Sequence, residues 1–167
     1  MSSASTLIRN VRVFDGETLH PQGWFHYSNV AVDFGNGPAP DFDSEIDGAG
    51  GYVTPLLFDT HIHGGGGFSA EKGAADMRGT LNHHRMSGTG VSFLSLMTDS
   101  IDNLCQQLNE ASDVDSKWFR GIHLEGPFLS RKFKGCHPKG LLSQPSDENI
   151  ARILNAGSNN LRSITLA

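Results

Sequence analysis

The stretch Val53–Gly67, VTPLLFDTHIHGGGG, decides how the rest of the chain is organised. Its apolar first part, Val53–Phe58, predicts a buried strand. Because alternate residues of a strand share a face, Asp59, His61 and His63 are expected to project together from the strand's C-terminal end. Two imidazoles beside a carboxylate form half of a metal site, and the glycines allow backbone or ligand to approach closely. Since His-x-His is a short pattern, surface histidines before a flexible loop remain the alternative.

Strand and helix patterns alternate after His63, with a repeat of roughly 30 to 40 residues, as βαβ units need. Strands are predicted at 91–96, 119–125 and 161–166, and helices at 74–86, 101–111 and 147–156. Such alternation implies a parallel sheet with right-handed crossovers. Two architectures satisfy it, an open doubly wound sheet and part of a β/α barrel. In both, the reactive groups belong at the C-terminal ends of the strands.

The first third of the chain has short strands and turns but no helical period. Strand patterns at 7–14 and 24–34 are ended by Asp15–Gly16 and by the Gly- and Pro-rich run 35–40. We expect a small antiparallel sheet region here. The predicted domains are therefore a β-rich portion at 1–54 and a β/α portion at 55–167.

Glu125 ends the strand predicted at 119–125, immediately before Gly126. A carboxylate there can reach the same point above the sheet as His61 and His63. Two histidines and one glutamate are a common ligand set for catalytic zinc or a similar divalent ion. The alternative is a glutamate that caps the following turn. His123, two residues earlier, is expected to be a packed, hydrogen-bonded interior residue.

Composition restricts the partners that the chain is expected to have. A net charge of -5, from 13 basic and 18 acidic residues, argues against nucleic-acid binding. No apolar run is long enough for a membrane span. The two cysteines, Cys105 and Cys136, suggest neither a disulfide framework nor a metal motif, which favours the cytoplasm. The loop Arg131–Lys139 is basic and suits an anionic substrate, although a solvated basic loop would have the same composition.

Two segments resemble a known family. Residues 54–64, TPLLFDTHIHG, resemble the first-strand metal motif of the amidohydrolase superfamily. The more specific segment is GIHLEGPFLS at 121–130, followed by KGCHP at 134–138, which resembles the N-acetylglucosamine-6-phosphate deacetylase family. The resemblance extends over essentially the whole chain but covers only the first part of the family's sequence.

This resemblance implies an α/β fold, the first half of a (β/α)8 metal-dependent hydrolase barrel (strands one to four) preceded by a small β-sandwich portion. The implied reaction is metal-dependent hydrolysis of the acetamide of N-acetylglucosamine 6-phosphate, giving glucosamine 6-phosphate and acetate. Glu125, His61 and His63 would bind a divalent metal such as Zn, Fe or Mn. Cys136 and His137 would contact the sugar phosphate. The full-length family member is expected to be a homodimer.

The chain also departs from the family. Leu56 replaces a usual glycine, and Cys136 a common alanine. The family's later strands carry two further metal-binding histidines and the catalytic aspartate, which serves as general base, and the 167 residues do not include them. We therefore expect no turnover by this chain alone. A non-catalytic or degenerate protein that binds a metal or a partner is one alternative. A dihydroorotase-like enzyme is disfavoured, because its metal-bridging lysine would lie on the fourth strand and no lysine follows Lys139.

Overall fold

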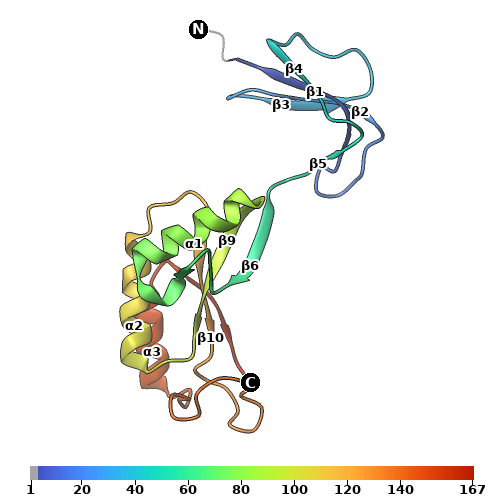
Figure 1. The fold of residues 1–167 in the computed structure, drawn as a ribbon. Coiled ribbons are helices and arrows are strands. Elements are labelled where there is room, and N and C mark those ends of the chain that lie inside the picture. Colours follow the sequence, from blue (N-terminus) through green and yellow to red (C-terminus); the bar gives the residue numbers. More distant parts are fainter. Residues whose placement is uncertain (1–3) are drawn as a thin grey trace. The chain divides into compact units, whose positions relative to one another are not determined.

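The computed structural model describes residues 4–167, which fall into two compact units (Figure 1). The first unit ends at Pro55 and the second is Leu56–Ala167. No helix in the described range is long and apolar enough to cross a membrane.

The first unit is one five-stranded sheet in the order β3-β2-β1-β4, with β5 also paired to β1. Its strands are β1 (Thr6–Val13), β2 (Gly23–Tyr27), β3 (Val32–Gly35), β4 (Ser44–Asp47) and β5 (Tyr52–Val53). β1 and β2 are antiparallel, as are β2 and β3, but β1 runs parallel to β4 and β5. The expected antiparallel sheet is thus a mixed one.

The prediction of a single strand at 24–34 is wrong, because a turn divides this segment into the hairpin β2–β3. The Ser28 N–H donates to the Ala31 carbonyl at 2.8 Å, and the Ser28 hydroxyl oxygen accepts from the Ala31 N–H at 3.1 Å. A serine can supply such local bonds to its own backbone, which favours a turn over a continuing strand.

The second unit is a four-stranded parallel sheet in the order β11-β10-β9-β6. The strands are β6 (Leu57–Ile62), β9 (Thr89–Met97), β10 (Phe119–Glu125) and β11 (Leu161–Thr165). The connecting helices are α1 (Ala74–Met86), α2 (Ile101–Glu110) and α3 (Asp147–Gly157), with 3-10 turns at Ala70–Lys72 and Ala111–Asp113. Each strand lies beside the next in chain order. A doubly wound sheet reverses its order at a switch point, so the described strands follow the barrel arrangement.

The helices cover one face of this sheet, as Figure 1 shows. Serines begin two of them, because the Ser100 and Ser146 side chains accept hydrogen bonds from the backbone N–H three residues later. Fully buried leucines and isoleucines of β9, β10, α2 and α3 form the core between the layers: Leu94, Leu96, Leu104, Leu108, Ile122, Leu124 and Ile153. This packing fixes the strand ends on which the candidate site lies.

The expectation that Val53–Phe58 forms a buried strand is wrong. Leu57 is 62% exposed and Phe58 is 50% exposed. Their strand, β6, is the end strand of the described sheet and pairs only with β9. Phe58 packs edge-on against Phe93 of β9, with ring centroids 4.9 Å apart, while Ile62 is buried. The bounds differ as well, because β6 begins only at Leu57 and extends to Ile62, so the apolar run predicts neither the limits of the strand nor its degree of burial.

Candidate metal centre

The three predicted metal ligands lie together at the C-terminal ends of two strands. His61 is near the end of β6, His63 follows it, and Glu125 ends β10. β9 lies between these two strands, so a parallel arrangement brings residues distant in sequence to one edge. One ligand atom from each of the three residues lies within 4.8 Å of the other two.

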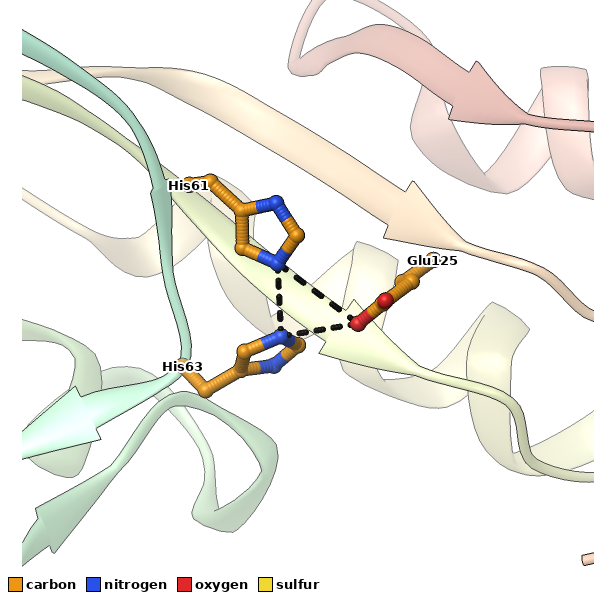
Figure 2. Close-up of side chains that lie close together, drawn as sticks. All are labelled: His61, His63 and Glu125. Atoms are coloured by element: carbon orange, nitrogen blue, oxygen red, sulfur yellow. Dashed lines mark hydrogen bonds and ion pairs between the residues drawn. The ribbon is translucent and has the colours of Figure 1, made fainter. Parts of the chain in front are cut away.

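Figure 2 shows both imidazoles turned toward the Glu125 carboxylate. The two Nε2 atoms of His61 and His63 are 2.9 Å apart. Glu125 Oε2 lies 2.9 Å from His63 Nε2 and 3.5 Å from His61 Nε2. Two nitrogens and one oxygen therefore form a small triangle.

This triangle fits a divalent ion. Ligand atoms of a tetrahedral zinc with bonds near 2.1 Å lie roughly 3.4 Å from one another. The three separations of 2.9, 2.9 and 3.5 Å come close to that value. Both histidines present Nε2, and the glutamate presents one oxygen, which is a ligand set typical of catalytic rather than closed structural zinc sites.

The charge of Glu125 also suits cation binding. Burial alone would raise the pKa of its carboxyl, but His63, His61 and His137 together hold the pKa below its ordinary value. A hydrogen bond from His63 acts in the same direction. The carboxylate is therefore available as an anionic ligand at neutral pH.

His137 is buried and approaches the second oxygen of Glu125. Its Nε2 is 3.6 Å from Glu125 Oε1, and its Nδ1 is 2.8 Å from Thr98 Oγ1. The Thr98 hydroxyl donates to the Glu125 carbonyl at 3.0 Å, so in the neutral ring His137 Nδ1–H is the donor to Thr98. The chain of contacts links His137 to both the side chain and the backbone of Glu125.

Thr98 was not predicted as part of the site, and Gly126 only as the end of a strand. Gly126 has φ of +88°, and a Cβ placed on it would lie 2.1 Å from Thr98 Oγ1. A side chain at this position would therefore displace the Thr98 hydroxyl. Thr98 directly follows β9 and precedes α2, so its sequence position suggests a helix cap. Only the pairing of β9 with β10 reveals its contact with Glu125.

His123 is the interior residue that its position on β10 predicts. It is 7% exposed, and its ring lies 4.8 Å from that of His61. Ser95 Oγ is 3.0 Å from His123 Nδ1, and Thr165 Oγ1 is 2.9 Å from His123 Nε2. Burial lowers the pKa of His123, and the neighbouring His61 lowers it further. Asp59, expected to project beside the two imidazoles, accepts a hydrogen bond from the His61 backbone N–H at 3.0 Å through its carboxylate.

Cys136 lies on the loop after β10 and is exposed, outside the triangle. Arg131, Lys132 and Lys139 are exposed on the same loop. The structure thus brings His137 to the cluster but leaves Cys136 and these cations facing solvent.

A run of parallel β/α units in barrel order, with two histidines and a glutamate at the strand ends, is the fold class of the metal-dependent (β/α)8 hydrolases. Within this class, the chain is similar to N-acetylglucosamine-6-phosphate deacetylases over part of their length, which confirms the resemblance read from the motifs. No protein-family profile matches the chain.

The curated relatives include the N-acetylglucosamine-6-phosphate deacetylase of Lysinibacillus sphaericus, 27% identical over 98% of this chain and 44% of that protein. The mouse (Mus musculus) enzyme of the same name is 31% identical over 81% of this chain and 31% of its own length. The N-acetylgalactosamine-6-phosphate deacetylase of Shewanella sp. (strain ANA-3) is 35% identical over 53% of this chain and 24% of that protein. The chain thus spans less than half the length of each of these relatives.

Among solved structures, a mutant N-acetyl-D-glucosamine-6-phosphate deacetylase of Mycobacterium smegmatis, in complex with N-acetyl-D-glucosamine-6-phosphate, superposes with a TM-score of 0.83. It is 31% identical, and the match covers 100% of this chain and 44% of that chain. The Pasteurella multocida enzyme has a TM-score of 0.80 at 20% identity, which shows the common fold. These matches confirm the predicted fold class.

Proposed function

We propose that this chain supplies one wall of the divalent metal centre of an N-acetylglucosamine-6-phosphate deacetylase. The single observation that carries the proposal is the convergence of His61 Nε2, His63 Nε2 and Glu125 Oε2 within hydrogen-bonding distances at the strand ends. The names of the relatives support the reaction class, which is hydrolysis of the acetamide to glucosamine 6-phosphate and acetate.

His61, His63 and Glu125 would hold a divalent metal, with Zn, Fe and Mn as the candidates. When bound, such an ion supplies Lewis acidity to an amide carbonyl and lowers the pKa of water. The protein's own contribution is to orient the ligands and the substrate. His137 has a ring nitrogen 3.6 Å from Glu125 Oε1, and we assign it and Cys136 to substrate contact.

The substrate is proposed to be an N-acetylhexosamine 6-phosphate. N-Acetylglucosamine 6-phosphate is our first candidate, because most of the similar proteins carry that name. N-Acetylgalactosamine 6-phosphate is the second, since two relatives are named for it and one of them is 35% identical. We propose that the cations of the loop Arg131–Lys139, of which Arg131, Lys132 and Lys139 are exposed, attract the phosphate.

We infer that the purified 167-residue chain binds a metal but does not release acetate. Three side chains complete only part of the ligand set and general-base machinery that the family resemblance implies. We also propose a cytoplasmic location, and a homodimer for the longer enzymes of this kind. A non-catalytic metal- or partner-binding protein is the alternative, and the inactive chain by itself would not distinguish the two.

The test compares the metal content of the wild-type chain with that of Glu125→Gln, after both are loaded with zinc and desalted. The variant is nearly isosteric but removes the anionic oxygen, so we expect it to retain less zinc than the wild type after desalting. Asp102→Asn, an exposed change on α2, is the control and should bind as the wild type does. Equal zinc content in wild type and Glu125→Gln would show that Glu125 is not a metal ligand. Acetate release from N-acetylglucosamine 6-phosphate by the wild-type chain would overturn the inference of inactivity.

A further inference from the structure

The four glycines after His63 form a tight hairpin rather than an open loop. β7 (Gly64–Gly65) pairs with β8 (Phe68–Ser69), and Gly66 and Gly67 make the turn with φ of +61° and +89°. The Ala70 N–H donates to the His63 carbonyl at 2.8 Å and closes the hairpin. The conformation of this hairpin therefore fixes the backbone on the C-terminal side of His63.

Helix α1 supplies the groups that fill the space left by the glycines. A Cβ on Gly65 would lie 2.7 Å from His83 Cδ2 and 2.8 Å from His84 Nε2. A Cβ on Gly66 would lie 2.6 Å from His83 Nδ1. The groups that approach Gly65 and Gly66 are thus the two imidazoles of α1, rather than the backbone or ligand expected from the glycine run.

The contact is reciprocal. On the helix side, a Cβ on Gly79 would lie 2.4 Å from the ring of Phe68, which belongs to β8. The hairpin and α1 therefore each place a glycine opposite a ring of the other. Met77 and Leu81 of α1 are buried in the core, so the helix is held on the sheet independently of its histidines.

We propose that His84 is a positioning residue for the metal cluster, acting through the hairpin on His63. The His84 Nε2 lies 2.9 Å from the Gly64 carbonyl oxygen. A carbonyl only accepts, so Nε2–H is the donor, and the neutral ring can make this bond. The two peptide carbonyls that follow His63 Cα are then both held, one by Ala70 and one by His84. This inference rests on the proposed metal site.

His63 needs such support because its own ring lacks the usual one. A metal-binding histidine normally donates its other ring N–H to a carboxylate or carbonyl, which fixes the ring. His63 Nδ1 is buried and has no hydrogen-bond partner within residues 4–167. With Nε2 facing His61 and Glu125, no hydrogen bond at Nδ1 orients the ring from behind, so the backbone that the hairpin and His84 hold contributes to its orientation.

The test uses the 167-residue chain and zinc alone. His84→Phe keeps a ring against the glycines but removes the donor, and we expect zinc affinity to fall ~10-fold or more, the usual effect of losing a group that orients a ligand. His84→Gln retains an N–H near the position of Nε2 and should recover most of that affinity. His83→Phe is the matched control, since it also keeps a ring against the glycines but His83 has no side-chain hydrogen bond in the described range to lose, and it should bind within about twofold of wild type.

Amide hydrogen exchange on the zinc-free chain provides the second measurement. His84→Phe should speed exchange at Ala70, whose N–H closes the hairpin, while α1 amides near Met77 keep wild-type protection. If His84→Phe binds zinc as tightly as wild type, or if His83→Phe loses as much affinity, the proposal is wrong. If wild type and Glu125→Gln bind zinc equally, the proposed metal site is wrong. In that case, unchanged exchange at Ala70 in His84→Phe would separately reject the positioning of the hairpin.

Discussion

Replacing Gly126 by alanine should destabilise the second unit more than a positive φ alone explains. A non-glycine residue in the left-handed region costs about 1–2 kcal/mol. The new Cβ would also lie 2.1 Å from Thr98 Oγ1, a buried atom that bonds the Glu125 carbonyl and His137 Nδ1. Losing these two hydrogen bonds adds about 1 kcal/mol each. We therefore expect Gly126→Ala to lower the free energy of unfolding by about 3–4 kcal/mol.

Gly135→Ala is the matched control for this prediction. Gly135 has φ of +57°, and no heavy atom lies within 4 Å of its ideal Cβ. Its substitution should carry only the backbone cost, about 1–2 kcal/mol. Urea unfolding followed by circular dichroism gives both values, provided that the slope with urea is unchanged. Equal destabilisation by the two variants would refute the clash with Thr98.

A double variant separates the clash from other effects of the methyl group. Thr98→Ala removes the oxygen that the new Cβ would meet. On this background, the additional cost of Gly126→Ala should fall to about 1–2 kcal/mol, the value of the left-handed conformation alone. If the cost stays at about 3–4 kcal/mol, contacts other than Thr98 determine it.

Two further predictions concern the reactivity of the two free cysteines and the ionisation of Asp15. At neutral pH, iodoacetamide should modify exposed Cys136 well before Cys105, because burial raises the pKa of the Cys105 thiol. Mass spectrometry of the digested protein would show the order of labelling, and simultaneous labelling of both cysteines would contradict the prediction. The pKa of Asp15 is lowered by hydrogen bonds from His20 and two backbone N–H groups, so its stabilising effect is present above the ordinary carboxyl pKa of about 4 and is lost as the pH falls below it. Asp15→Asn should therefore lower the Tm near neutrality by more than at pH 3, and an equal shift at both pH values would contradict this.

Elements with strong local signals could be predicted from sequence with accurate bounds. The helix at 74–86 and the strand at 119–125 are observed at those residues. Apolar periodicity marks them, and adjacent glycines mark where they end. The convergence of His61, His63 and Glu125 could also be predicted, because parallel strands bring their C-terminal ends to one edge.

Features that depend on neighbouring elements could not be predicted in this way. The exposure of Leu57 and Phe58 follows from the position of β6 at the end of the described sheet, and an apolar run has the same composition at an edge as at the centre. The turn at Ser28 depends on hydrogen bonds that compete with strand pairing, and alternation of Val30 and Val32 around it conceals the break.

The groups that support the ligands are the least visible in sequence. A glycine in the sequence shows only that a side chain is absent. The side chain that occupies the freed space lies far away along the chain. Gly64 and His84 are 20 residues apart, and Thr98 and the Glu125 carbonyl are 27 residues apart. In both cases a polar side chain bonds a backbone carbonyl beside a ligand, and a glycine provides the room. The backbone after β6 and the end of β10 are thus supported by different elements, α1 and the residue after β9, so the two sides of the candidate metal cluster are positioned by separate sets of contacts.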